Sequence, residues 1–145
     1  MIFVSVTRLR VRSFLFLPQF MWHAARSMRQ TEHSQGFLHG QVQREARNTF
    51  WTVTLWCDPE SMNSFRLSGA HRAAMPRLLE WCDEASVVHW AQETAQLPQW
   101  TEAHRRMVAE GRLSKVNHPS SDHSANRIPA PVPSRIGREM KPAQS

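Results

Sequence analysis

The sequence contains no tyrosine and only two cysteines, Cys57 and Cys82. Neither cysteine belongs to a CxxC or Cys/His pattern, so nothing in the sequence indicates a cysteine-based metal site. Cys57 ends an apolar strand pattern, and Cys82 lies in an amphipathic helix pattern. We interpret both as buried free thiols, which a reducing, cytoplasmic compartment would preserve.

Long hydrophobic runs are also missing. A basic stretch from Arg8 to Arg12 precedes the apolar cluster Phe14–Leu17, but this cluster is only four residues long before Pro18. A signal peptide needs a longer apolar region, and a transmembrane helix needs about 18 consecutive apolar residues. We therefore expect a soluble, cytoplasmic protein without a membrane span.

The signatures of several enzyme classes are absent. The sequence has no paired-carboxylate pattern, nucleophile elbow, phosphate-binding loop or zinc motif. These absences argue against hydrolase, kinase and metallohydrolase functions, and we predict no metal site.

Charge is unevenly distributed along the chain. Residues 1–56 carry a net charge of +5, residues 57–111 one of −3, and residues 112–145 one of +4. The basic total would suit a nucleic-acid partner, but no DNA- or RNA-binding motif accompanies it. Net charge by itself bears on solubility and non-specific contacts, so we do not favour nucleic acid as a partner.

Hydrophobic periodicity predicts the element order β-α-β-β-α-β. Alternation with a period of two indicates strands, and a period near 3.6 indicates helices. Asp58, Pro59 and Glu60 supply an N-cap, a first-position proline and an acidic first turn, as expected where a helix begins. Ser68 and Gly69 interrupt this second helix. The predicted strands are 2–8, 37–44, 49–57 and 85–90, and the predicted helices are 17–34, 58–67, 70–81 and 100–110.

The segment 49–57 is the clearest strand. Bulky residues occur on both of its faces, which is typical of a central strand that is covered on both sides. One face carries Phe50, Thr52, Thr54 and Trp56, and the other carries Trp51, Val53, Leu55 and Cys57.

Together these elements predict one α+β domain of the ferredoxin-like type over residues 1–111. Its helices would cover one face of the sheet, and the other face would need a partner. A second copy of the chain is the simplest partner, because symmetric homodimers are the commonest oligomers. We therefore predict a dimeric α/β barrel. Residues 112–145 contain five prolines and no aromatic residue, and we predict that they form a disordered basic tail.

Five segments of the sequence carry a family resemblance: Val6–Arg10, Phe20–His23, Phe50–Trp56, Phe65–Leu78 and Glu84–Trp90. They resemble uncharacterised bacterial proteins related to spheroidene monooxygenase and to the antibiotic biosynthesis monooxygenase superfamily. The resemblance implies a dimeric α/β barrel with a pocket for a small apolar molecule. Members of the superfamily oxidise quinol-like or polycyclic aromatic substrates, or degrade haem.

The resemblance leaves the cofactor open between none and haem. The haem-degrading branch has a histidine on the second helix, after a strand that ends in tryptophan. Counted from Trp56, that place falls near Met75 in this sequence, with His71 one helical turn earlier. Met75 is also a residue type that can ligate haem iron.

Two histidines are the candidate catalytic residues. His71 follows a glycine where a helix restarts, and a neutral imidazole there could act as a base or a ligand. Alternatively, it is a partly exposed residue that hydrogen-bonds to a turn. His89 alternates with Val88 on the strand 85–90, and it either projects into a pocket or serves the strand structurally. His23 is interpreted as a surface or edge residue.

The candidate substrate-binding residues are mainly tryptophans. Aromatic walls suit flat apolar ligands, although packing in the core or at a dimer interface would explain the same residues. An arginine could neutralise an anionic substrate, although Arg66, Arg72 and Arg77 also fit a solvated helix face. The candidates are Trp51, Trp56, Trp90 and Arg72.

From these observations we expect a homodimeric, monooxygenase-like protein. It would bind a small apolar or aromatic molecule in a pocket lined by tryptophan and histidine, where it could also oxidise it. The alternative is a non-catalytic protein on the same scaffold that binds or senses a small molecule or haem. In a third interpretation, the basic tail after Gly111 docks on an anionic partner.

Overall fold

A six-stranded antiparallel sheet forms the centre of the computed structural model, which describes residues 1–132 and 136–143. The strand order in this described part is β5-β4-β1-β3-β2-β6. The order β4-β1-β3-β2 confirms the predicted ferredoxin-like arrangement. The strands are β1 (Ile2–Val11), β2 (Phe37–Glu45), β3 (Thr49–Trp56), β4 (Cys82–Gln92), β5 (Arg112–Leu113) and β6 (Gly137–Met140).

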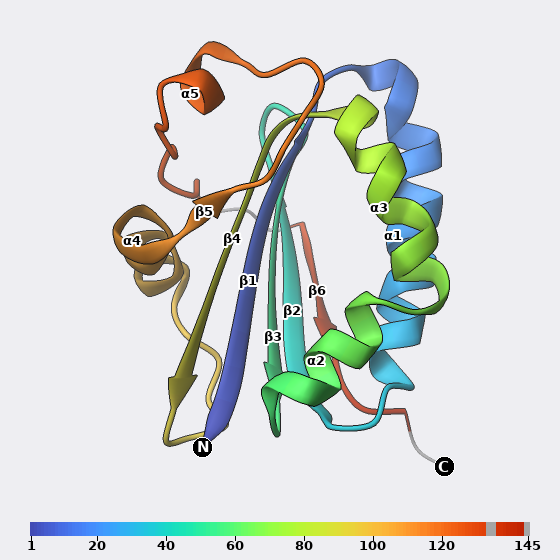
Figure 1. The fold of residues 1–145 in the computed structure, drawn as a ribbon, viewed down its shortest axis with the longest axis vertical. Helices are drawn as coiled ribbons and strands as arrows, with labels where there is room; N and C mark the ends of the chain where they lie inside the picture. Colours follow the sequence, from blue (N-terminus) through green and yellow to red (C-terminus); the bar gives the residue numbers. More distant parts are fainter. Residues whose placement is uncertain (133–135, 144–145) are drawn as a thin grey trace.

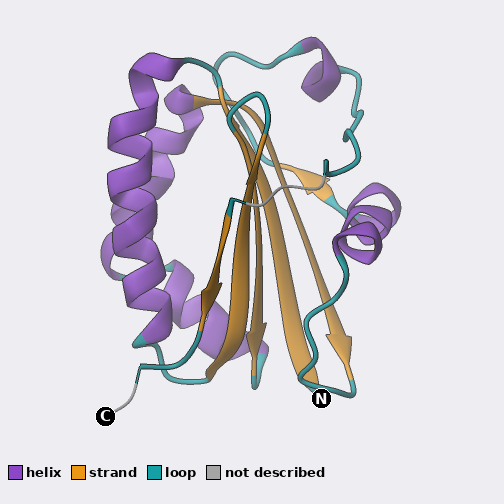
Figure 2. Ribbon diagram, turned by 180° about the vertical axis from the view of Figure 1, so that it is seen from behind, coloured by secondary structure: helices purple, strands orange, loops and turns teal. Residues whose placement is uncertain are grey.

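Helices lie on both faces of the sheet (Figures 1 and 2). The first three α-helices cover one face, which we call the helix-facing side, and α4 lies over the opposite face, which we call the α4 side. A 3-10 turn, η1, leads into α1. The helical elements are η1 (Phe14–Phe16), α1 (Leu17–Glu32), α2 (Pro59–Arg66), α3 (Gly69–Trp81), α4 (Trp100–Glu110) and α5 (Ser121–Ser124).

The second predicted helix is indeed divided in two. Asp58 caps α2, and its carboxylate accepts a hydrogen bond of 2.7 Å from the backbone N–H of Ser61. At the first residue of α3, Gly69 adopts a φ of 58°, a left-handed conformation that favours glycine. The amide of Gln30 on α1 donates to the carbonyl of Ser68 at 2.8 Å and accepts from the N–H of His71 at 2.8 Å. Gln30 therefore fastens this turn to α1.

The predicted two faces of the strand 49–57 are confirmed. Trp51, Val53 and Leu55 belong to one hydrophobic cluster, whereas Phe50 and Trp56 belong to clusters on the opposite face. β3 pairs with β1 on one side and with β2 on the other. It is therefore an interior strand covered on both faces, as its sequence indicated.

The α4 side of the sheet is covered within the chain, which corrects the expectation of a face left open for a second copy. Trp51, Val53 and Leu55 are completely buried, and Ala103 and Met107 of α4 pack against them in one cluster. The predicted helix 100–110 supplies this cover. A weakly amphipathic helix pattern does not reveal the surface on which the helix will pack.

The predicted disorder of residues 112–145 does not hold for the part of this segment that the structure describes. β5 pairs with β4, and β6 pairs with β2, so the segment extends the sheet at both edges. Val116 and Met140 are buried in hydrophobic clusters. Edge strands offer unpaired backbone groups to any extended segment, so a polar, proline-containing chain can dock with few apolar residues. Residues 133–135 and 144–145 of the predicted tail lie outside the described residues.

The two cysteines differ in exposure. Cys82 is buried and Cys57 is exposed, so the prediction of two buried thiols was correct for Cys82 alone. Cys57 directly follows β3, where the chain leaves the sheet. In the described ranges, none of the helices combines the length and the hydrophobicity needed to cross a bilayer.

Candidate functional site

The helix-facing side of the sheet has apolar residues at its two ends and polar residues between them. Phe50 and Ala85 pack under α1 and α3 at one end, and Phe3 and Trp56 pack under α2 at the other. Between these clusters lies a group that we call the hydroxyl band. It consists of Ser5, Thr7, Thr52 and Thr54, all half-buried.

Strand register brings the hydroxyl band together. Ser5 lies opposite Thr54, and Thr7 lies opposite Thr52, in the β1–β3 pairing. On its other side β1 pairs with β4, where Ser5 lies opposite His89. Paired residues in an antiparallel sheet project to the same face, so His89 extends the hydroxyl band.

The band has unused hydrogen-bonding capacity. In the described part of the chain, the hydroxyls of Ser5, Thr7 and Thr52 make no side-chain hydrogen bond, and they are not among the buried orphaned atoms. Thr54 accepts a hydrogen bond of 2.9 Å from the indole N–H of Trp56, which leaves its own proton free to donate. These groups can therefore bind water or the polar group of a ligand.

Aromatic rings connect the two candidate histidines. The ring of His71 on α3 lies 4.8 Å from that of Phe65 on α2. The Phe65 ring in turn lies 5.4 Å from that of Trp56 on β3. On the sheet, the ring of Phe3 lies 5.4 Å from that of His89. Phe3 and Trp56 are register partners in the β1–β3 pairing. His71 and His89 thus lie at the two ends of one aromatic arc on the helix-facing side.

His71 has one ring nitrogen available. Its Nδ1 lies 3.1 Å from the backbone carbonyl of Arg66. A carbonyl oxygen only accepts hydrogen bonds, so Nδ1 carries the proton and Nε2 of the neutral ring is left with its lone pair. The predicted contact with a turn and the predicted role of base are therefore compatible.

Both histidines are held neutral by their surroundings. Burial lowers the pKa of His71, and the nearby charge of Arg66 lowers it further, against the raising effect of the hydrogen bond to the Arg66 carbonyl. Burial also lowers the pKa of His89, with the charges of Arg112 and Arg66 acting in the same direction. Neutral imidazole can accept a proton at neutral pH, so both residues have the protonation state that a general base requires.

The sheet separates the predicted tryptophans. Trp56 lies on the helix-facing side with both histidines, whereas Trp51 and Trp90 lie in the core of the α4 side. Arg72 is exposed on α3 and forms no ion pair with the described residues. Of the four predicted substrate-binding residues, Trp56 alone joins His71 and His89 on the aromatic arc.

Sequence reasoning did not single out Phe3, Phe65 or the hydroxyl band as site residues. The period-two pattern already assigned Phe3, Ser5 and Thr7 to one face of their strand. The missing information was the strand register, which places this face beside Thr54 and His89. Arg112 was also missed. Its charge lowers the pKa of His89, but it lies in the segment predicted to be disordered, which the structure pairs with Val87 through β5.

The described residues do not form a haem cradle around the predicted ligands. His71 and Met75 share α3, but the Phe65 ring packs against the His71 ring. Two surface pockets lie between α1 and α3, and neither is lined by His71, Met75 or His89. No group of three or more His, Cys, Asp or Glu residues in the described ranges could hold a metal ion. We therefore derive no reaction step through haem.

Comparison with known proteins identifies a family and a fold. Residues 16–113 match the family model described as a domain of unknown function (DUF3291). No curated protein matches the sequence.

Several solved structures share the fold at low sequence identity. A conserved protein from Methanosarcina mazei has a TM-score of 0.57 at 18% identity, over 64% of this chain and 94% of its own. SnoaB, a cofactor-independent oxygenase from Streptomyces nogalater, has a TM-score of 0.54 at 16% identity, over 68% and 98%. A Nitrosomonas europaea protein, provisionally described as an antibiotic biosynthesis monooxygenase, has a TM-score of 0.58 at 10% identity, over 65% and 92%. These likenesses show that the chain has the fold of the antibiotic biosynthesis monooxygenase-like proteins.

Proposed function

Since the chain belongs to the DUF3291 family, for which no function is known, we propose a function from its own site. The protein binds a small apolar or aromatic molecule on the helix-facing side of the sheet and oxidises it as a monooxygenase-like enzyme. The observation that carries this proposal is the hydroxyl band, which ends at His89 and is bordered by an aromatic arc. This arrangement combines apolar walls with a few polar groups, as small-molecule sites do.

The proposed chemistry starts with proton removal. A phenol- or quinol-like substrate gives its proton to the ring of His89 or to Nε2 of His71, both of which are neutral. Ser5 and Thr54 donate hydrogen bonds to the oxygen anion that forms, and thereby stabilise the charge as it develops. The electron-rich anion then reacts with dioxygen: a C–O bond forms at a ring carbon, this carbon loses its proton as the O–O bond breaks, and the second oxygen atom leaves as water. The products are a quinone-like molecule and water, so the substrate itself supplies all four electrons that reduce dioxygen.

Two lines of support favour an oxygenase over other chemistries. The fold is shared with SnoaB, which is a cofactor-independent oxygenase, and the polar groups present suit acid–base chemistry on an aromatic alcohol. The resemblance to spheroidene monooxygenase, and a cytoplasmic location, remain predictions. A shared fold does not by itself transfer an activity, so the proposal rests on the residues of the site.

A non-catalytic binding or sensing protein is the second candidate. Its support is the exposed position of Arg72 and the placement of Trp51 and Trp90 away from the histidines. The same aromatic arc and hydroxyl band would then hold a ligand without turnover.

Homodimerisation is also a proposal. The predicted interface is covered by α4, so a dimer through this face requires α4 to move. Light scattering of the purified protein measures the mass directly. Twice the mass of the chain would support the dimer, and the mass of a single chain would contradict it.

The first test of the proposed function is an absorption spectrum, taken on the purified protein and during a titration with haemin. A Soret band that saturates at one haem per chain would contradict the cofactor-free mechanism. Without such a band, oxygen consumption is measured with a panel of hydroquinones, naphthols and polycyclic phenols. Turnover by the wild-type protein is the expected result.

Variants then locate the base. His89→Ala and His71→Ala are compared with His118→Ala, which changes an exposed histidine paired with Glu80. Loss of a general base lowers turnover by about 10²–10⁴-fold, and the control variant should retain full activity. Ligand binding without oxygen consumption would favour the non-catalytic candidate. Unchanged turnover in both His71→Ala and His89→Ala would show that neither histidine is the base.

A further inference from the structure

The outer surface of α1 and the preceding η1 turn exposes large apolar side chains. Phe14 is 76% exposed, Leu15 85%, Trp22 58% and Met21 42%. They occur within nine consecutive residues, Phe14–Trp22, at the beginning of the helix. Scattered exposed hydrophobic residues are normal on protein surfaces, but a cluster of this kind marks an interaction site.

Unpaired arginines flank this apolar cluster. Arg26 and Arg29 are exposed on α1, and Arg77 is exposed on the neighbouring helix α3. None of the three forms an ion pair with the described residues, and Arg26 instead stacks over the ring of Trp22 at 4.7 Å. Each guanidinium is therefore available to an anionic partner.

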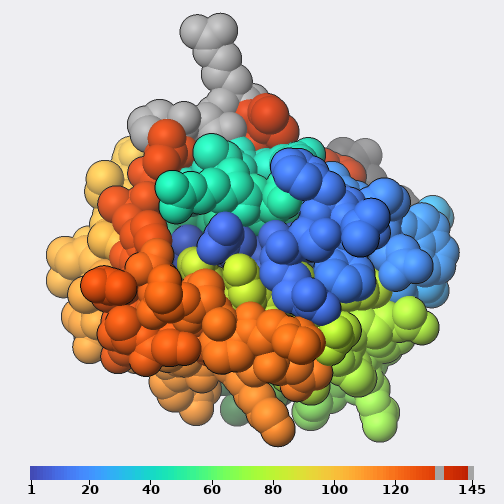
Figure 3. All heavy atoms as spheres, turned by 90° about the horizontal axis from the view of Figure 1, so that it is seen from above, coloured from blue at the N-terminus to red at the C-terminus, as the bar shows by residue number. Residues whose placement is uncertain are grey.

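Carboxylates are absent from the same surface. The chain has no Asp or Glu before Glu32 and none from Ser61 to Leu79. The outer surface of α1 and of most of α3 is consequently positively charged, with no carboxylates to neutralise its arginines. Figure 3 shows the start of α1 and the end of α3 side by side on one flank of the molecule.

A shallow depression lies between the two helices. This pocket of about 610 Å³ is lined by Pro18, Trp22, His23 and Arg26 from α1 and by Ala73 and Arg77 from α3. The Nδ1 atom of His23 is buried there without a hydrogen-bond partner in the described chain. The surface therefore combines apolar side chains, positive charge and an unsatisfied polar atom.

We propose that the η1–α1–α3 surface docks the protein on an anionic lipid bilayer. Phe14, Leu15 and Trp22 enter the interface between headgroups and acyl chains, and Arg26, Arg29 and Arg77 bind lipid phosphates. Amphipathic surfaces of this composition bind membranes through buried apolar area and attraction to anionic lipids. The inference is independent of the proposed oxidation, although an apolar substrate would be concentrated in the same membrane.

The apolar residues favour lipid over the other anionic partners. A nucleic acid or an acidic protein would use the arginines, but it would gain little from Phe14 and Leu15, which are largely exposed in the η1 turn. A second copy of this chain would place like charges against one another. A bilayer offers both the negative charge and the apolar phase that this surface requires.

Vesicle co-sedimentation tests the proposal with the full-length protein. The probes are phosphatidylcholine vesicles with and without phosphatidylglycerol, at low and high salt. We expect binding to the anionic vesicles alone, and weaker binding at high salt. The tryptophan emission of the protein should shift to shorter wavelength on binding, because the exposed indole of Trp22 enters a less polar environment.

Two double variants separate the apolar from the cationic contribution. Phe14→Ser with Leu15→Ser should weaken binding roughly tenfold or more, through lost apolar burial. Arg26→Gln with Arg29→Gln should weaken it about 25-fold, since each arginine near an anionic surface contributes roughly fivefold. The control, Arg105→Gln with Arg127→Gln, removes the same charge from α4 and from the segment after α5. It should retain most of the binding.

Several outcomes overturn the proposal. Equal binding to neutral and anionic vesicles would show that the η1–α1–α3 surface is not the docking site. So would an equal loss of binding in the Arg105→Gln/Arg127→Gln control. An RNA oligonucleotide that binds through Arg26 and Arg29 while the Phe14/Leu15 variant keeps full vesicle binding would make the surface a polyanion site. Unchanged thermal midpoints establish that the exposed substitutions leave the fold intact.

Discussion

The two sides of the central sheet differ in how completely they are closed. On the α4 side, Val4, Val6 and Trp51 are fully buried under α4. On the helix-facing side, the hydroxyl band and His89 remain half-buried although three helices lie above them. The same strands build both surfaces, because alternate residues project to opposite faces.

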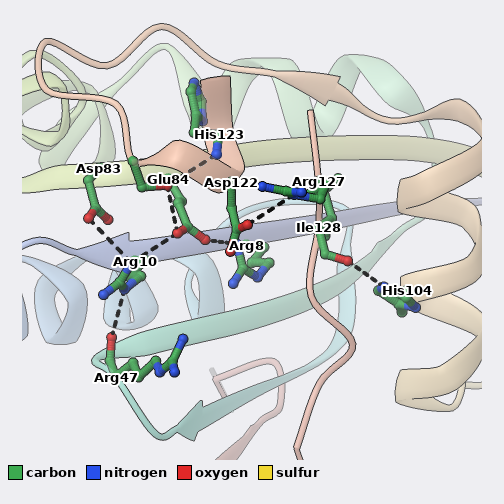
Figure 4. Close-up of polar contacts among 11 residues, drawn as sticks. Arg8, Arg10, Arg47, Asp83, Glu84, His104, Asp122, His123, Arg127 and Ile128 are labelled. Atoms are coloured by element: carbon green, nitrogen blue, oxygen red, sulfur yellow. Dashed lines mark hydrogen bonds and ion pairs between the residues drawn. The ribbon is translucent and has the colours of Figure 1, made fainter. Parts of the chain in front are cut away.

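The polar groups of the two sides also differ. On the α4 side, Arg8 and Glu84 form a buried ion pair at 2.6 Å (Figure 4). Arg10 and Ser120 also donate hydrogen bonds to Glu84. On the helix-facing side the hydroxyls of Ser5, Thr7 and Thr52 have no side-chain partner among the described residues, and Thr54 only accepts a hydrogen bond from Trp56. Two polar atoms of the α4 side, Arg8 Nε and Trp51 Nε1, also lack a partner among the described residues, but they are buried, whereas the half-buried hydroxyls of the helix-facing side are accessible to a ligand. The α4 side therefore serves stability, and the accessible groups that the proposed binding requires lie on the helix-facing side.

The largest difference in stability is expected between variants of two neighbouring β3 residues, Trp51 and Thr52, which project to opposite sides of the sheet. Trp51→Ala removes a fully buried indole and should lower the free energy of unfolding by about 3–5 kcal/mol. Thr52→Ala removes a half-buried hydroxyl without a partner and should lower it by less than about 1 kcal/mol. Urea denaturation followed by circular dichroism measures both. Equal losses would contradict the division of roles.

A buried and an exposed ion pair provide the second comparison. Burial raises the pKa of Glu84, but hydrogen bonds from Arg8 and Ser120 more than offset this and leave the pKa below its usual value. Glu84→Gln leaves Arg8 buried without its counter-charge and should cost about 3 kcal/mol. Glu102→Gln breaks exposed contacts with Arg105 and Arg106 and should leave the urea midpoint almost unchanged. A stable Glu84→Gln protein would show that the ion pair is dispensable.

The pH dependence of stability should reveal the lowered pKa values of the two histidines on the helix-facing side. His71 and His89 have lowered pKa values in the folded protein, whereas the unfolded chain binds these protons near the ordinary pKa of 6.5. Stability is therefore fully present above this pH and decreases as the pH falls below it. His71→Gln and His89→Gln should each flatten this decrease between about pH 7 and 5. Urea midpoints across this range test the expectation, and unchanged slopes would contradict it.

The smallest effect concerns the two thiols. Burial raises the pKa of Cys82 to about 12, with the charge of Asp83 adding to it, and a thiol of this kind is unreactive at neutral pH. Cys57 is exposed. Iodoacetamide should therefore modify one thiol per native chain, and Cys57→Ser should abolish the reaction with little change in stability. Rapid modification of Cys82 would indicate that its end of the sheet opens readily.

The candidate site was only partly predictable. His71 and His89 were proposed from their residue type and local pattern, and the structure places both on the aromatic arc, where their catalytic role remains a proposal. Trp51 and Trp90 were proposed on the same grounds, but they lie across the sheet. Residue type indicates what a side chain can do, whereas the choice of face depends on the strand phase and on the register between strands.

By itself, the sequence determined the order of elements from residue 2 to residue 110 and the two faces of β3. These features depend on local periodicity and on signals such as the Asp58 cap, which act within a few residues. Tertiary structure alone decided that α4 covers the second face, that residues 112–132 and 136–143 dock at both sheet edges, and that Arg8 meets Glu84. Each of these contacts joins residues far apart in the chain. They form through backbone pairing or shared burial, which leave no pattern in the composition of either segment.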